Sequence, residues 1–302
     1  MEWKGRRQSN NVEDRRGGGG AKVGGGISIL GLIAAFIGWK FFGADPIATY
    51  QNTQQVTQQT STQQTAPKQE TADQAEIRQF VATVLADTED VWTPIFQQSG
   101  RQYKEPGLVL YSGVTATACG AGQSAMGPFY CPADQKVYID TAFFKEMRSK
   151  MGMTGEQNQS QLQNQERVGD FAMAYVIAHE VGHHVQTLLG ISKQVTQAQQ
   201  QAGSKAQANQ YLVRLELQAD CFAGLWAKNN HQRTHFLQQG DIQEAMDAAE
   251  KIGDDYLQHK AHGHVVPDSF THGTSAQRQR WFMRGFDSGN INQCDTFNTQ
   301  QL

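Results

Sequence analysis

The 302-residue sequence has little of what is typical of a wholly globular chain. Only 38% of its residues are hydrophobic and 18% are charged, so part of the length is not expected to belong to a folded core. The formal net charge is only −3, which gives no electrostatic basis for nucleic acid as the main partner. No internal repeat is evident, and the length suits one sizeable domain or two small ones.

Cysteine is also scarce. The four cysteines form no C-x-x-C array, and their spacings argue against a zinc site built from cysteines. Their number alone does not determine whether they are oxidised, because that depends on the compartment. In an exported domain we expect Cys119 and Cys131 to staple a loop and Cys221 and Cys294 to tie a helix to the C-terminal tail. Free buried cysteines are the alternative.

An uncharged, largely apolar stretch predicts a membrane anchor near the N-terminus. It runs between Lys22 and Lys40, at the short end of the roughly 20 apolar residues that span a bilayer. Six basic residues precede it: Lys4, Arg6, Arg7, Arg15, Arg16 and Lys22. Since basic flanks stay in the cytoplasm, we predict a single-pass inner-membrane protein with its N-terminus inside and its main domain periplasmic or extracellular. A cleaved signal peptide and a buried core helix are the alternatives. The long basic region without an A-x-A site argues against the first.

The expected organisation has four parts: a basic cytoplasmic segment (1–22), a transmembrane anchor (23–43), a linker rich in Gln and Thr (44–74) and a folded domain (75–298). The linker has almost no large apolar side chains, so burial cannot offset the entropy of ordering it.

Helical periodicity dominates residues 75–298. "GLVLYSGVT" (107–115) and "KVYID" (136–140) are typical of short strands. The polar, Gln-rich residues 192–210 are expected to form a surface excursion between two helices. The pattern predicts an α+β fold, mostly helical with one small sheet.

"VIAHEVGHHVQ", residues 176–186, places three histidines and a glutamate in an otherwise apolar helical run. Burying ionisable groups without partners is costly, so a metal ion is the natural explanation. His179 and His183 project from one helix face, where a single turn can supply two nitrogen ligands to zinc. Glu180 is offset beside them, placed to take a proton from a zinc-activated water. We do not expect His184, about 100° around the helix from His183, to bind the metal; it could cap a carbonyl, face solvent or hydrogen-bond elsewhere. A helix with exposed histidines is the alternative.

"LELQADCFAGLW", residues 215–226, adds a second pair of residues four apart. Glu216 can supply an oxygen as third ligand, completing a His₂Glu site for one Zn²⁺ with one position open to water. Asp220, one turn further, can accept a hydrogen bond from a ligating histidine. Such a pair is ordinarily a solvated helix edge, but the preceding H-E-x-x-H favours ligation.

The two motifs together resemble the gluzincin pattern of thermolysin-like and CAAX-protease-like zinc peptidases. More widely, the chain resembles the bacterial family of neutral zinc metallopeptidases, except in its Gln-rich insertions. The stretches that carry this resemblance include "MEWKGRRQSNNVEDRRG", "FYCPADQKVYID", "AHEVGHHVQ", "ELQADCFAG", "VPDSFTHGTSAQRQRWF" and "CDTF".

The resemblance implies a membrane-anchored zinc endopeptidase of zincin-like fold. His179, His183 and Glu216 would bind zinc, Glu180 would be the base and Asp220 would orient a histidine. "KVYID" resembles the zincin edge strand beside the cleft, where a peptide substrate adds as an extra strand. "THGTSAQRQR" resembles a T-H-P-x-x-x-x-R stretch, with Gly273 in place of proline.

The predicted reaction is hydrolysis of a peptide bond in a protein or peptide substrate of the cell envelope. A further donor is expected to stabilise the oxyanion. His272 is the first candidate, and the others are Arg278, Arg280, His264 and Tyr138; the two arginines alternatively pair with carboxylates. Two other classes stay open. One is an inactive envelope binding protein with a structural zinc site, and the other is a zinc hydrolase of a non-peptide amide.

Overall fold

The computed structural model describes residues 1–16, 70–144 and 169–302. The chain forms two compact units, one of Met1–Asp14 with Ala72–Leu302 and one of Arg15–Thr71. The predicted anchor (23–43) and most of the predicted linker (44–74) lie outside the described residues. Within the described ranges, no helix is both long and apolar enough to cross a membrane.

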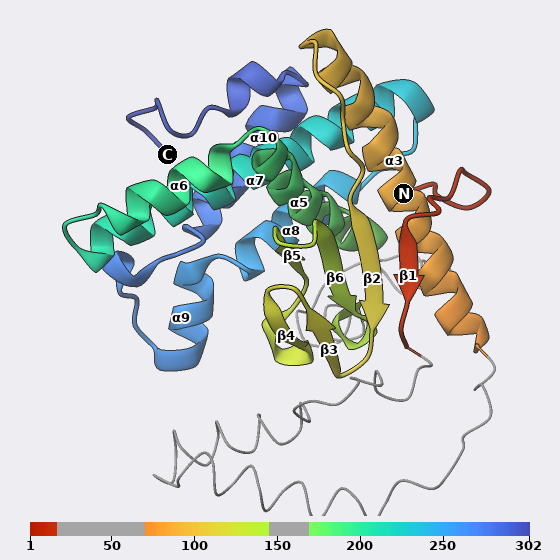
Figure 1. Ribbon diagram of the computed structural model, residues 1–302, viewed down its shortest axis with the longest axis horizontal. Helices are drawn as coiled ribbons and strands as arrows, with labels where there is room; N and C mark the ends of the chain where they lie inside the picture. The colour runs from red at the N-terminus through yellow and green to blue at the C-terminus, as the bar shows by residue number, and fades with distance from the viewer. Residues whose placement is uncertain (17–69, 145–168) are drawn as a thin grey trace, which may run out of the picture. The chain divides into compact units, whose positions relative to one another are not determined.

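The first unit contains a four-stranded sheet of order β1-β2-β6-β5 (Figure 1). Strands β1 (Val12–Asp14), β2 (Gly107–Tyr111) and β6 (Lys136–Asp140) are parallel, and β5 (Phe129–Cys131) pairs antiparallel with β6. A hairpin of β3 (Val114–Thr117) and β4 (Gly120–Gln123) follows β2.

The predicted role of "KVYID" as an edge strand is wrong. This segment is β6, which is hydrogen-bonded to β2 on one side and to β5 on the other. Strand β5 takes the edge instead. Its three residues are too few to show a periodic pattern in the sequence.

The apolar side chains of the sheet divide between its two faces. Leu108 and Leu110 join the main core with the helices, whereas Val109, Tyr111 and Tyr138 form a smaller cluster on the other face. Both faces are therefore covered, which explains why β2 is an almost unbroken apolar run.

Helices make up most of the unit (Figure 1). They are α3 (Ala72–Gln98), α5 (Asp170–Leu188), α6 (Ile191–Gln200), α7 (Lys205–Thr234), α8 (Asp241–Lys251), α9 (Asp254–His262) and α10 (Ser275–Ser288), with short 3-10 turns η1 (Ser124–Met126), η3 (Pro267–Ser269) and η4 (Ile291–Cys294). The mixed, mostly helical fold class is as expected. Residues 192–210, predicted as a surface excursion, belong largely to α6 and to the start of α7.

Glycines allow α5, α7 and α10 to pack closely. A Cβ on Gly182 of α5 would lie 3.2 Å from the Cα of Ala219 on α7, so these two helices approach backbone to backbone. Cβ atoms on Gly224 and Gly285 would lie 1.9 Å from the carbonyl oxygens of Phe282 and Cys221. Only glycine fits at this crossing of α7 and α10.

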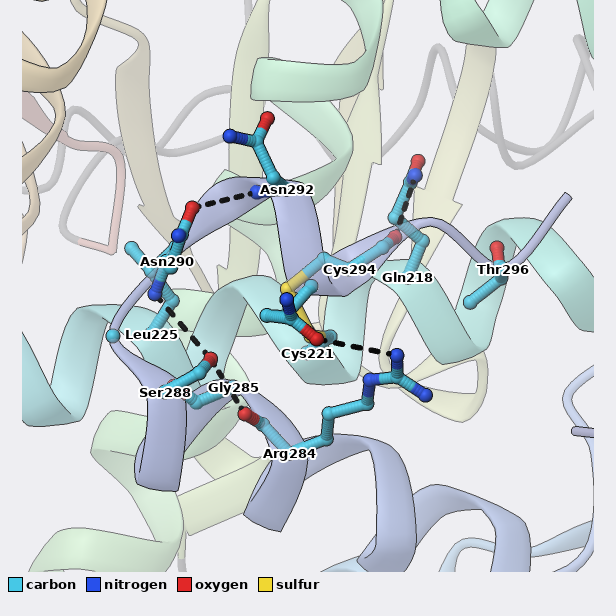
Figure 2. Close-up of a disulfide and its surroundings, with 12 residues drawn as sticks. Gln218, Cys221, Leu225, Arg284, Gly285, Ser288, Asn290, Asn292, Cys294 and Thr296 are labelled. Carbon is cyan, nitrogen blue, oxygen red and sulfur yellow. Dashed lines mark hydrogen bonds between the residues drawn. A yellow bond between two sulfur atoms is a disulfide. The ribbon is translucent and has the colours of Figure 1, made fainter. Parts of the chain in front are cut away.

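Both expected disulfides are present. Cys119–Cys131 ties the β3–β4 turn to β5, with a Cα–Cα distance of 5.8 Å. Cys221–Cys294 joins α7 to η4 (Figure 2), with a Cα–Cα distance of 5.5 Å. Beside it, the side chain of Gln218 donates to the carbonyl of Cys294 at 2.9 Å.

The N-terminal residues depart from the predicted organisation. Residues 1–22 were expected to form a separate segment, but Met1–Asp14 belongs to the same compact unit as Ala72–Leu302. Strand β1 is an edge of the sheet, and Met1 and Trp3 are buried in the core. The predicted domain, 75–298, therefore omits an N-terminal part of the folded unit.

Candidate metal centre

The predicted ligands come together from α5 and α7. One potential ligand atom from each of His179, His183 and Glu216 lies within 4.8 Å of the other two. The Nε2 atoms of His179 and His183 lie 3.1 and 3.4 Å from the two carboxylate oxygens of Glu216. Tetrahedral zinc with bonds of 2.0–2.1 Å holds its ligand atoms about 3.3 Å apart, so these three side chains fit one such ion.

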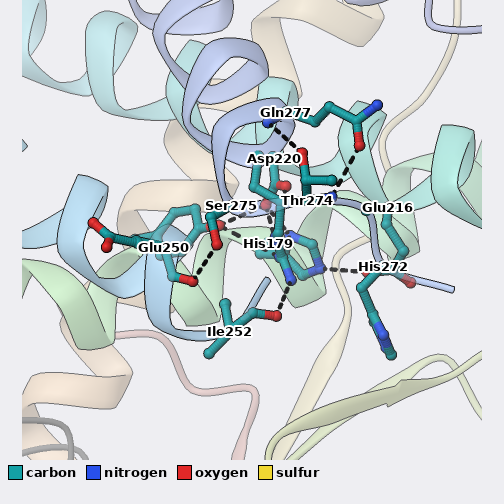
Figure 3. A network of polar contacts seen from close by, with 12 residues as sticks. His179, Glu216, Asp220, Glu250, Ile252, His272, Thr274, Ser275 and Gln277 are labelled. Carbon is teal, nitrogen blue, oxygen red and sulfur yellow. Dashed lines mark hydrogen bonds and ion pairs between the residues drawn. The ribbon is translucent and has the colours of Figure 1, made fainter. Parts of the chain in front are cut away.

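Hydrogen bonds at the far nitrogens orient both imidazoles. His179 Nδ1 lies 2.8 Å from Asp220 Oδ1, and His183 Nδ1 lies 2.9 Å from Gln186 Oε1 (Figure 3 shows the first pair). Because these oxygens accept, each Nδ1 donates its proton and Nε2 faces Glu216, the arrangement of metal-binding histidines. The role predicted for Asp220 agrees with this geometry. Gln186 was not singled out, although it lies one turn from His183.

Asp220 is itself held by a buried network. Arg278 donates to both of its oxygens at 2.9 Å, and the Tyr175 hydroxyl donates to Oδ1 at 2.6 Å. Burial alone would raise the pKa of Asp220, but Arg278 and His179 hold it below its usual value. Arg278 therefore pairs with a carboxylate, which was the alternative to a role at the oxyanion.

The same contacts change the pKa values of the ligands. Burial alone would lower the pKa of His179, yet Asp220 and Glu216 raise it to about 10. Burial would raise the pKa of Glu216, but the two imidazoles hold it well below its usual value. Because zinc binds the neutral imidazole, a raised pKa of His179 makes metal binding at this site depend on pH.

A cleft of about 600 Å³ opens at this site. The three ligands and Glu180 line it together. Its apolar walls come from β5 and the segments that flank this strand, and from α5, α6, α7 and the α8–α9 region. The apolar lining residues are Met126, Pro128, Phe129, Tyr130, Pro132, Phe143, Val176, Val195, Leu212, Leu215, Ile252 and Leu257. Among the described lining residues there is no lysine, and Arg278 is already bound to Asp220. Helix α6, which supplies Val195, was not predicted to form part of the site.

His272 also lines the cleft. Its Nδ1 lies 3.2 Å from Asp254 Oδ1, and the backbone N–H groups of Thr271, His272 and Gly273 donate to Asp254 Oδ2. The hydrogen bond with Asp254 raises the pKa of His272. Asp254 was missed, because nothing in the sequence links it to a histidine 18 residues away. Gly273 has a φ of 91°, which proline cannot adopt; this accounts for the departure from T-H-P.

The remaining candidates for the oxyanion donor do not line the cleft. Tyr138 donates to Asp134 at 2.7 Å, Arg280 donates to the Leu302 carbonyl, and His264 lies on the exposed surface. Of the five candidates for the oxyanion donor, only His272 both lines the cleft and has a largely exposed side chain, at 51%.

His184 bonds away from the metal, as expected. Its Nε2 lies 2.6 Å from the carbonyl oxygen of Lys104, which can only accept, so this nitrogen carries the proton. Burial lowers the pKa of His184 to about 4, so the ring is neutral and its Nδ1 accepts from the Tyr130 hydroxyl at 3.0 Å. The metal helix is thereby tied to β5, the strand that carries Tyr130. No pattern in the sequence pointed to Tyr130.

The fold brings an H-E-x-x-H helix and a glutamate of the next long helix together in one group that could hold a metal ion. The sequence profile of the family described as "Putative neutral zinc metallopeptidase" matches residues 1–297, and the chain belongs to this family.

Relatives match most or nearly all of the chain. The Escherichia coli (strain K12) protein named "Uncharacterized protein YpfJ" is 48% identical over 305 residues, covering 98% of this chain and 99% of that protein. The Mycobacterium bovis protein named "Uncharacterized protein Mb2605" is 40% identical over 221 residues, covering 70% of this chain and 68% of its own length. The Mycobacterium tuberculosis (strain H37Rv) protein named "Uncharacterized protein Rv2575" matches to the same extent. No solved structure matches the chain.

Proposed function

We propose that the chain is a zinc metalloendopeptidase that hydrolyses peptide bonds. The observation that carries this proposal is the position of Glu180 in the same cleft as the atoms of His179, His183 and Glu216 that fit a zinc ion. The family description supports zinc and, more coarsely, peptidase activity.

When bound, zinc supplies a Lewis acid that activates a water and polarises the scissile carbonyl. The Glu180 carboxylate takes a proton from the attacking water and passes it to the leaving amine. His272 donates a hydrogen bond to the developing oxyanion of the substrate, and Asp254 holds its ring in place. Asp220 and Gln186 fix the two ligating imidazoles.

Strand β5 is the surface along which we propose that the substrate binds. Among the described strands, β5 has a neighbour on one side only, and Phe129 and Tyr130 on it line the cleft. An extended peptide can add to such an edge through its backbone. The apolar walls and the lack of an unpaired lysine or arginine among the described lining residues favour internal apolar sequences over a chain end with a free carboxylate.

We propose the cell envelope as the place of action. Disulfides persist in oxidising compartments, and all four cysteines are paired. The apolar stretch 23–43 is the proposed membrane attachment.

Zinc content and cleavage of casein or a peptide library test the proposal on the purified full chain. We expect one zinc per chain, cleavage that stops with a chelator, and a Glu180→Gln variant that keeps the zinc but cleaves nothing. Cleavage by that variant would overturn the role of Glu180. Zinc binding without cleavage by the wild type would favour a binding protein. Release of a non-peptide amide from cell-wall material alone would favour an amidase.

A further inference from the structure

Residues 1–14 pack against the catalytic part of the chain through their backbone. Strand β1 pairs in parallel with β2, with Val12 opposite Leu108 and Asp14 opposite Leu110. Ahead of it, the Ser9 N–H donates to the Ala82 carbonyl of α3 at 2.9 Å. These backbone hydrogen bonds join residues that are far apart in the sequence. They are therefore tertiary contacts of one folded unit and not local structure of the N-terminal segment.

The basic residues of this segment are used in ion pairs with α3. Arg6 lies 2.6 Å from Asp87, Arg7 lies 2.6 Å from Asp90, and Lys4 lies 2.7 Å from Glu76. The Arg6–Asp87 pair is the most buried, with side chains 18% and 3% exposed, whereas the Lys4–Glu76 side chains are 55% and 45% exposed. Three of the six basic residues that predicted a cytoplasmic N-terminus therefore have partners inside the domain.

Trp3 anchors the segment in the core. Its side chain packs edge-on against Phe80 at 5.4 Å between ring centroids, and its Nε1 donates to Asp170 at 3.0 Å. Asp170 is the first residue of α5, the helix that carries the metal ligands. The Glu2 N–H donates to the Phe236 carbonyl at 2.7 Å. Besides β2, the segment thus contacts α3, α5 and Phe236.

The ends of the intervening segment also meet. Residues 17–69 are not described, but the residues that flank them are in contact, with Arg16 Nη2 lying 3.0 Å from Glu70 Oε1. A chain that crosses a bilayer once has its two flanks separated by a hydrocarbon layer of about 30 Å. Neither this ion pair nor those of Arg6 and Arg7 can form across such a layer.

We infer that residues 1–14 and residues 72–302 fold together on the same side of the membrane. This arrangement is incompatible with the single-pass topology that the sequence predicted. Lys4, Arg6 and Arg7 act as ion-pair partners of α3 and not as a signal that retains the N-terminus in the cytoplasm. The inference does not depend on the proposed catalytic activity.

Thiol labelling of the full chain in cells tests this topology. Asn10 and Gln97 are exposed, and all four native cysteines are in disulfides, so Asn10→Cys and Gln97→Cys each add one accessible thiol. A membrane-impermeant maleimide is applied to spheroplasts before and after lysis, with a cytoplasmic and a periplasmic protein as controls. We expect the two positions to behave alike, so that both label before lysis or both label only after it. Labelling of one before lysis and of the other only after it would overturn the inference.

A cleavable version of the chain gives a second measurement. A protease site is inserted at Gln54 in the predicted linker, and the purified protein is cut. We expect the N-terminal fragment to stay bound to the domain, Arg6→Glu to release it, and the exposed control Lys4→Glu to retain it. Dissociation of the wild-type fragment as readily as that of Arg6→Glu would contradict the docking.

Discussion

The carboxylate of Asp220 lies 2.8 Å from Nδ1 of His179, and the same carboxylate accepts two hydrogen bonds from Arg278. This one side chain joins His179, a proposed metal ligand on α5, to Arg278, a cation on α10. It therefore serves both the orientation of the ligand and the stability of the core.

Asp220→Asn should weaken zinc binding and the fold together. Its loss of charge removes the anionic partner of His179, for which a reduction in metal affinity of about 10–100-fold is expected. It also leaves the buried Arg278 without its counter-charge, at a cost of about 3 kcal/mol in the free energy of unfolding. Chelator competition and denaturant unfolding measure the two effects. Asp247→Asn, on α8, is the control and should change neither; equal effects in both variants would contradict the role of Asp220.

Tyr130→Phe should raise KM for a peptide substrate about fivefold and leave kcat and zinc content nearly unchanged. The substitution removes the hydroxyl that bonds to His184 but keeps the ring in the cleft, and a lost hydrogen bond costs about 1 kcal/mol. Strand β5 is then held less firmly beside α5. Steady-state kinetics provide the measurement. Tyr138→Phe, whose hydroxyl bonds to Asp134 outside the cleft, is the matched control, and an equal rise in KM there would count against the positioning role.

The pH dependence of kcat should respond to Asp254. To bond Asp254 through Nδ1 and the oxyanion through Nε2, His272 must carry both protons. The hydrogen bond with Asp254 raises the pKa of His272, so the active, protonated form persists to higher pH. In Asp254→Asn that pKa falls, and the alkaline limb of the kcat profile should move to lower pH.

His272→Ala should lower kcat about 10²–10³-fold, the usual effect of removing an oxyanion donor, and should abolish the alkaline limb. Full pH profiles of the wild type and of both variants are the measurement. An alkaline limb that stays in place in both variants would assign it to another group.

Gly224→Ala should destabilise the fold strongly. The added Cβ would lie 1.9 Å from the carbonyl oxygen of Phe282, so α7 and α10 must move apart, at a cost of about 3 kcal/mol or more. Gly203→Ala is the control, because its nearest neighbour would be 3.6 Å away. Thermal and denaturant unfolding compare the two. Similar midpoints would show that the crossing tolerates a methyl group.

Much of the metal site is readable from the sequence because its geometry is local. Residues four apart on a helix share a face whatever surrounds it, so His179 with His183, and Glu216 with Asp220, were identifiable as pairs. The two pairs face each other because α5 and α7 approach closely at Gly182 and Ala219, a contact that helix periodicity does not define. Tyr130 and Asp254 were missed, because their histidine partners lie 54 and 18 residues away.

The sequence by itself indicated which residues are able to bind zinc, which residue can act as a base, and where most of the helices lie, since these depend on side-chain chemistry and on a repeat of a few residues. Only the tertiary structure decided which strand borders the cleft and what the N-terminal charges contact. A lysine or arginine is the same in sequence whether it faces a lipid headgroup or a buried aspartate, and only the packing of distant segments distinguishes the two.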